Sequence, residues 1–106
     1  MQYRTLGRTK LRVSEIGMGC EGFLEKTPEQ VCRLVDAMHA HGVNCIDLYA
    51  PNPDMRENLG RALAGRRGDF VLQTHLCSIW QDGQYKRTRD MALVRPAFED
   101  QLTRLG

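Results

Sequence analysis

The sequence lacks three features that would point to particular classes of protein. No sign of charge dominates, because 15 Lys and Arg residues face 13 Asp and Glu residues, a net charge of +2. That balance gives no support to a nucleic-acid partner or to a membrane-surface partner. No apolar run approaches the roughly 18–20 residues of a membrane span. The opening residues MQYRTLGRTKLRV contain no signal-peptide core, so we expect a cytoplasmic location.

The cysteine spacings of metal sites are also missing. Cys20, Cys32, Cys45 and Cys77 form no CxxC pair and no mixed Cys and His ligand pattern, so we expect no metal. In a reducing compartment all four should be free thiols. The apolar neighbours of Cys32 and Cys45 favour a role for these two in filling the core.

What the chain does have is the composition of a globular domain. Hydrophobic residues make up 42% and charged residues 26% of its 106 residues. Both values are near the globular average, and the length is that of one domain, residues 1–106.

Strand and helix signals alternate along this domain. Residues 3–13 predict a hairpin with its turn at 7–10, and residues 14–20 predict a short strand with two glycines. Thr27, Pro28 and Gln30 then have the spacing of a capping box with proline at the first helical position.

The first predicted helix has one apolar face and ends at Gly42. The residues of that face are Val31, Leu34, Val35 and Met38. The remaining predictions are a strand at 43–48, a helix capped by Asp54, a strand at 70–76, a polar loop at 78–90 and a helix from about Asp90. On the last helix we expect Val94, Phe98, Leu102 and Leu105 to face inward, and Pro96 either kinks this helix or marks its start.

A hairpin followed by three βα units predicts an α/β fold with a parallel sheet and right-handed crossovers. A complete (βα)₈ TIM barrel needs roughly 250 residues, so the pattern is that of an incomplete barrel and suggests a fragment. A small self-contained α/β domain is the alternative.

The carboxyl ends of the predicted strands carry the polar residues with the most chemistry. In parallel α/β folds ligands bind at these ends. The strand ends are Gly19-Cys20-Glu21, Asp47-Leu48-Tyr49 and Thr74-His75. An imidazole beside a carboxylate and a phenol could handle protons. The alternatives are structural roles: Asp47 would cap a loop, Tyr49 would form part of a pocket wall, and His75 would only hydrogen-bond within the fold.

Two other motifs are less specific. The basic run Lys86-Arg87-Arg89 suggests either phosphate binding or, more commonly, a solvated loop. Gly17-x-Gly19 lacks the third glycine of a Rossmann fingerprint.

Four segments together resemble the aldo-keto reductases. They are YRTLGRTKLRVSEIGMGC, GVNCIDLYAPNP with the following ENLGRAL, RRGDFVLQTHL and FEDQLTRLG, in the order in which the family has their counterparts. The resemblance covers nearly the whole chain. It implies the N-terminal hairpin and first three βα units of a (βα)₈ barrel.

The resemblance also implies a chemistry. Aldo-keto reductases transfer hydride between NADPH and a small-molecule carbonyl, without metal. A tyrosine protonates the carbonyl oxygen, a lysine lowers the pKa of that tyrosine, and an aspartate pairs with the lysine. On this resemblance we expect Asp47, Tyr49 and His75 to be catalytic and Gly19, Cys20 and Glu21 to bind the cofactor.

The sequence departs from the family pattern at two of these positions. Asp47 matches the family aspartate, but the family tyrosine lies five residues further on, where this chain has Asn52. Tyr49 is only two residues after Asp47. The family lysine is replaced by His75, and an imidazole carries less positive charge near neutral pH than an ammonium group does.

These observations leave two kinds of function open. The first is an NADPH-dependent carbonyl oxidoreductase, inactive as residues 1–106 alone. The second is a non-catalytic dinucleotide-binding module, or one that self-associates through open sheet edges. The IWQDGQYKRTRD segment and the Thr-His strand end also resemble a divergent bacterial branch whose members carry a C-terminal ferredoxin-like segment.

Overall fold

Three parallel strands form the centre of the structure, a computed structural model that describes all 106 residues. They are β3 (Gly17–Gly19), β4 (Cys45–Leu48) and β5 (Val71–Thr74), in that order across the sheet. The helices are α1 (Pro28–Ala40), α2 (Pro53–Leu63) and α3 (Met91–Leu105), with short 3₁₀ helices η1 (Cys20–Phe23) and η2 (Arg67–Asp69). Two hairpins, β1 (Tyr3–Thr5) with β2 (Arg12–Ser14) and β6 (Ser78–Gln81) with β7 (Gln84–Arg87), complete the fold.

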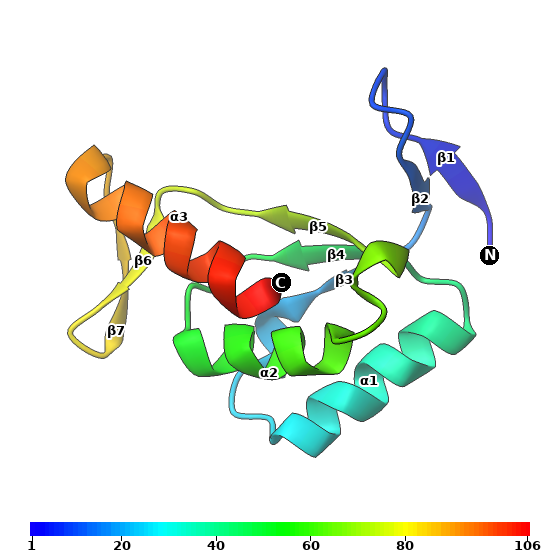
Figure 1. Ribbon diagram of the computed structural model, residues 1–106, viewed down its shortest axis with the longest axis horizontal. Coiled ribbons are helices and arrows are strands. Elements are labelled where there is room, and N and C mark those ends of the chain that lie inside the picture. Colours follow the sequence, from blue (N-terminus) through cyan, green and yellow to red (C-terminus); the bar gives the residue numbers. More distant parts are fainter.

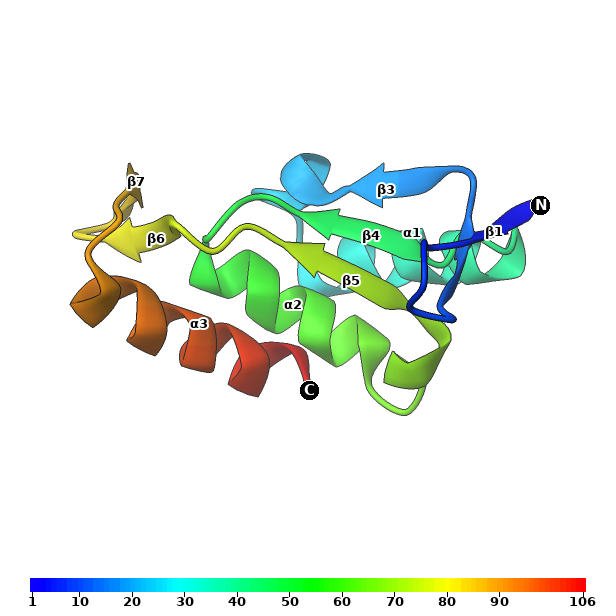
Figure 2. The same cartoon turned by 90° about the horizontal axis from the view of Figure 1, so that it is seen from above.

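The predicted α/β class and the parallel sheet are confirmed. Gly19 lies opposite Asp47, and Leu48 lies opposite Thr74. All three strands therefore end at the same edge. The β6–β7 hairpin lies toward this carboxyl edge, and the β1–β2 hairpin lies at the opposite end of the sheet (Figures 1 and 2).

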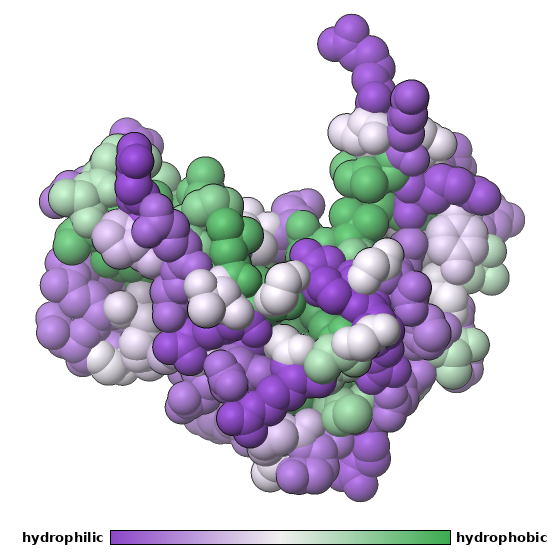
Figure 3. Space-filling view, in the orientation of Figure 1, coloured by the Kyte–Doolittle hydropathy of each residue, from purple (hydrophilic) through white to green (hydrophobic).

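The core lies between the sheet and the helices. Ile46 and Leu48 of β4 are fully buried, whereas Cys45 and Asp47, which alternate with them, are only half-buried. Because successive side chains of a strand point to opposite faces, one face of the sheet is covered and the other is open. Val35 of α1 and Leu59 of α2 belong to the covered core. In Figure 3, apolar surface is visible in the notch between the two ends of the molecule.

Helix α1 has the start that the sequence predicts. The Thr27 hydroxyl accepts a hydrogen bond from the Gln30 backbone nitrogen at 3.3 Å, and the Gln30 side chain accepts one from the Thr27 nitrogen at 2.9 Å. The helix ends before Gly42, whose φ of 73° lies in the left-handed region. Of the predicted face, Val31, Val35 and Met38 are buried and Leu34 is half-buried.

Both the first hairpin and the strand after it differ little from expectation. The hairpin pairs Tyr3 with Ser14 and Thr5 with Arg12. The strand predicted at 14–20 is divided, because residues 15 and 16 turn the chain from β2 into β3.

The prediction of a polar loop at 78–90 is wrong. This segment contains the second hairpin, in which Trp80 lies opposite Tyr85. Asp82 and Gly83 have φ values of 54° and 74° and form its two-residue turn. An Asp-Gly pair readily adopts two consecutive left-handed residues, which suits a tight turn between antiparallel strands.

The predicted N-cap of α2 is also wrong. Asn52, not Asp54, caps this helix, and its side-chain oxygen accepts a hydrogen bond from the Met55 nitrogen at 2.9 Å. Pro53 then occupies the first helical position, where its missing N–H has no cost. The helix therefore begins one residue before the predicted cap.

Helix α3 begins where predicted, since the Asp90 carboxylate accepts a hydrogen bond from the Ala92 nitrogen at 2.9 Å. Pro96 lies within this helix rather than at its start. Val94 and Leu105 face inward as expected, but Phe98 and Leu102 are 37% and 54% exposed. They lie beside β5, the last strand of the sheet, with no further element to cover them.

The structure contains neither a membrane-spanning helix nor a cluster of metal-binding side chains. No helix is both long enough and apolar enough to cross a membrane. No three His, Cys, Asp or Glu side chains lie close enough together to hold a metal ion.

Candidate functional site

The carboxyl edge of the sheet brings together three of the predicted site residues. Asp47 lies in β4, Tyr49 follows that strand, and His75 follows β5. The Nε2 atom of His75 lies 2.9 Å from Oδ1 of Asp47. Residues 28 positions apart thus form a hydrogen-bonded carboxylate–imidazole pair, because parallel strands place their ends side by side.

The chemistry of the carboxylate fixes the direction of this hydrogen bond. An ionised carboxylate can only accept a hydrogen bond, so the His75 Nε2 carries a hydrogen and donates a hydrogen bond to Asp47. The Nδ1 atom of His75 is then the nitrogen that is free to accept or bind a second proton. The side chains are 39% exposed for His75 and 46% for Asp47, so the site is an open edge and not an enclosed cavity.

Tyr49 packs against the His75 ring of this pair. Its ring meets the His75 ring edge-on, with centroids 5.3 Å apart and an interplanar angle of 85°. On its other side it stacks on Tyr85 of β7, with centroids 5.8 Å apart. Edge-to-face and offset-stacked arrangements are the favoured geometries of aromatic pairs.

The two phenols influence each other. The contact with the Tyr85 hydroxyl, and then the negative charge of Tyr85 when it is ionised, raise the pKa of Tyr49. The Ser78 hydroxyl, 3.4 Å from the Tyr85 hydroxyl, is the largest cause that lowers the pKa of Tyr85, and Tyr49 adds to it. Tyr49 is therefore the phenol that holds its proton more firmly, and Tyr85 is the one that loses it more readily.

Asn52, at the position that matches the family tyrosine, serves another purpose. It caps α2 through the hydrogen bond to the Met55 nitrogen. A side chain held by a helix terminus is not free to act on a ligand at the strand ends. Tyr49 is thus the phenol from this loop that reaches the Asp47–His75 pair.

The residues at the end of β3 are arranged differently. Gly19 is exposed, and a Cβ at its position would find no atom within 4 Å. The Cys20 side chain is fully buried, and burial followed by the charge of Asp47 raises the pKa of its thiol to about 12. Glu21 is exposed. The whole residue is buried, so Cys20 offers no accessible atom to a ligand, in contrast to its neighbours Gly19 and Glu21.

Tyr85 joins the site although the sequence places it only in a polar segment. The Asp82-Gly83 turn is the signal that identifies it, because a two-residue turn sets the register of the hairpin. The basic run that follows is solvated: Lys86 and Arg87 are exposed, and the Lys86 ammonium donates a hydrogen bond to the Gln81 side chain at 2.9 Å.

Comparisons with known proteins show which proteins this chain resembles in sequence and in fold. No family model matches the chain. Over 110 aligned residues it is 32% identical to YqkF, an uncharacterized oxidoreductase of Bacillus subtilis, covering 99% of the chain and 35% of that protein.

Solved structures give the same result. A Pseudomonas aeruginosa protein described as an aldo-keto reductase superposes with a TM-score of 0.83 and 30% identity, covering 97% of this chain and 42% of that one. The holo form of an aldo-keto reductase from Bacillus halodurans has a TM-score of 0.83 and 31% identity, covering 99% of this chain and 36% of that one. The chain thus spans 35% to 42% of the length of these relatives. In sequence and in fold it is similar to part of an aldo-keto reductase barrel, namely the N-terminal hairpin and three βα units.

Proposed function

We propose that this chain supplies the proton-handling part of a site that reduces a small carbonyl compound with NADPH. The observation that carries the proposal is the Asp47–His75 hydrogen bond of 2.9 Å with the Tyr49 ring against it, at the carboxyl edge of a parallel sheet. The chain spans 35% to 42% of its relatives, so the activity is proposed for the whole protein. We expect no turnover from residues 1–106 alone.

The polar groups at the strand ends suit one part of NADPH. They are the exposed backbone of Gly19, the carboxylates of Glu21 and Asp47, and the His75 imidazole. These groups suit the amide and ring of the nicotinamide, whereas two carboxylates disfavour its phosphates. Bound NADPH would supply a hydride to the carbonyl carbon.

The residues of this chain would manage the proton. Asp47 holds the imidazole of His75 in one orientation, and the Tyr49 hydroxyl donates a proton to the carbonyl oxygen. Because its pKa is raised, Tyr49 is protonated at neutral pH but is a weak acid. A positive charge on His75 would favour the phenolate of Tyr49 and so make this tyrosine a better donor.

The test is the oxidation of NADPH by the complete encoded protein with a reactive aromatic aldehyde. Asp47→Asn and His75→Gln should each lower kcat/KM by about tenfold or more, since positioned acid–base groups contribute roughly 10²–10⁴-fold. His41→Gln is the matched control, because this exposed histidine at the end of α1 bonds only to a backbone oxygen of its own helix. Turnover that is equally fast in all variants would contradict the proposal.

A second candidate function is a module that binds the dinucleotide without turnover. It is favoured by the capping role of Asn52 and by the histidine at the family's lysine position. It predicts NADPH binding by the complete protein, with no aldehyde reduction under any condition.

Self-association through open sheet edges is the other form of this alternative. Beside the edge strand β5, Leu76, Met91 and Phe98 line a hollow of about 550 Å³. Analytical ultracentrifugation tests for self-association, because a compact monomer at all concentrations would exclude it.

A further inference from the structure

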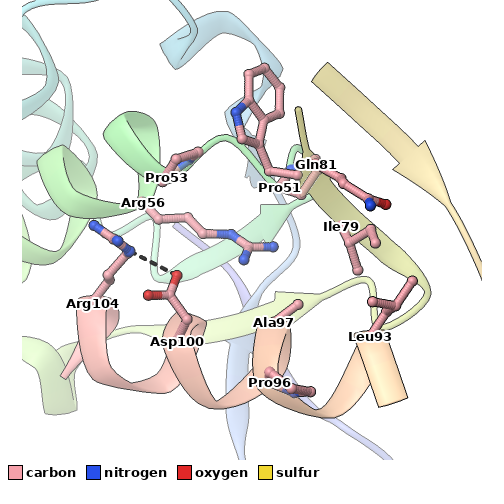
Figure 4. A pocket seen from close by; sticks show the side chains of 11 residues that line it. Pro51, Pro53, Arg56, Ile79, Gln81, Leu93, Pro96, Ala97, Asp100 and Arg104 are labelled. Carbon is pink, nitrogen blue, oxygen red and sulfur yellow. Dashed lines mark hydrogen bonds and ion pairs between the residues drawn. The ribbon is translucent and has the colours of Figure 1, made fainter. Parts of the chain in front are cut away.

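A second hollow, separate from the candidate active site, lies between α2, the β6 strand and α3 (Figure 4). Its volume is about 400 Å³, which is within the range of small-molecule sites. Its apolar lining includes Pro51, Ile79, Leu93 and Pro96, and Trp80 also lines it. None of the six strand-end residues discussed above lines it.

Arg56 of α2 is the unusual feature of this hollow. Only 3% of the Arg56 surface is exposed, and its Nε is buried with no hydrogen-bond partner. No carboxylate lies within ion-pair distance of its guanidinium. Figure 4 shows the side chain extending from α2 into the space between the α3 residues and Ile79. A buried charge without a partner is costly, so this arrangement calls for an acceptor.

The neighbouring charges are already paired with one another. The Arg104 Nε lies 2.8 Å from Asp100, and its Nη1 lies 3.5 Å from Glu57. Burial lowers the pKa of Arg56, and the charge of Asp100 offsets this effect only in part. The one cation of the hollow that is left without a partner is Arg56.

We infer that this hollow binds a small organic carboxylate, with its carboxylate on the Arg56 guanidinium and its apolar body against Ile79 and Leu93. The planar fork of a guanidinium matches a carboxylate with two parallel hydrogen bonds. A single unpaired cation suits a monoanion. Because Asp100 borders the hollow, a more highly charged phosphate would be repelled.

Trp80 makes the proposal directly testable. It is the only tryptophan of the chain and it lines the hollow. Benzoate added to the complete encoded protein should therefore change the tryptophan fluorescence in a saturable way, and Trp80→Phe should remove that change. The NMR signal of the Arg56 Nε–H provides a second readout that depends on the guanidinium itself.

Variants separate anion recognition from simple apolar binding. Arg56→Gln should weaken benzoate binding by roughly ten- to a hundredfold, the range expected for a charge-assisted hydrogen bond. Arg61→Gln, on the same helix but exposed and paired with Glu57, should leave binding unchanged.

Four results would overturn the proposal. They are no response of either readout to benzoate, equal binding of benzyl alcohol, unchanged binding by Arg56→Gln, and tighter binding of inorganic phosphate than of benzoate. None of these readouts depends on turnover, so the outcome is distinguishable from that of the proposed function.

Discussion

The close contact between α2 and α3 predicts that replacing a helical glycine by alanine, a change that usually stabilises a helix, destabilises this protein at Gly60. Gly60 lies inside α2, where a change from glycine to alanine ordinarily stabilises a helix by up to about 1 kcal/mol. In this structure a Cβ at Gly60 would lie 1.8 Å from the backbone oxygen of Arg104 in α3. An ordinary contact between carbon and oxygen is about 3.3 Å, so the two helices would have to separate by roughly 1.5 Å.

The expected loss follows from that separation. Overpacking a tight contact costs about 1–3 kcal/mol, and here the obstacle is backbone, which cannot rotate away. Even after the gain in helix propensity, Gly60→Ala should lower the free energy of unfolding. For a chain of this size each kcal/mol corresponds to roughly 4–8 °C in Tm.

The assay is thermal unfolding followed by circular dichroism. Gly68→Ala is the matched control, because Gly68 has no atom within 4 Å of a Cβ and does not have a positive φ. Gly60→Ala should melt at a clearly lower temperature than both the natural sequence and Gly68→Ala. A Tm for Gly60→Ala equal to or above that of the natural sequence would refute the proposed packing of α2 on α3.

Three further predictions follow from local features. Thr27→Ala should lower the free energy of unfolding by about 1 kcal/mol, because the capping box is lost; an unchanged Tm would contradict this. Cys20, whose thiol pKa is raised to about 12, should resist iodoacetamide at mildly alkaline pH while the exposed Cys77 reacts, as mass spectrometry of the folded chain would show. Ser78→Ala should raise the pKa of Tyr85 in an NMR titration, since the serine hydroxyl is the main cause that lowers it; a fall would refute that contact.

Much of the central fold can be predicted from the sequence because its signals are local. The capping box at Thr27 needs only residues three positions apart, and the structure has both of its hydrogen bonds. The meeting of Asp47 with His75 needs one more premise, that parallel strands end at a common edge. That premise holds in the structure, where the His75 Nε2 lies 2.9 Å from the Asp47 Oδ1.

The errors arise where two signals compete or where distant parts decide. At the start of α2, Asn52 and Asp54 are both good capping residues, and the proline between them favours the earlier one. In the 78–90 segment, polar residues suggest a loop, but the Asp82-Gly83 turn imposes a hairpin. On α3, helical periodicity predicts an inward Phe98 and Leu102, yet only a neighbour beyond β5 could cover them.

The most direct test of the proposed function compares two tyrosines that stack on each other. We would measure kcat/KM for aldehyde reduction by the complete encoded protein with NADPH, in Tyr49→Phe and in Tyr85→Phe. If Tyr49 donates the proton, Tyr49→Phe should lose about a hundredfold or more, whereas Tyr85→Phe should keep most of the activity. A large loss in Tyr85→Phe with little effect of Tyr49→Phe would contradict the assignment, and equal activity of both variants would contradict a phenolic proton donor at this site.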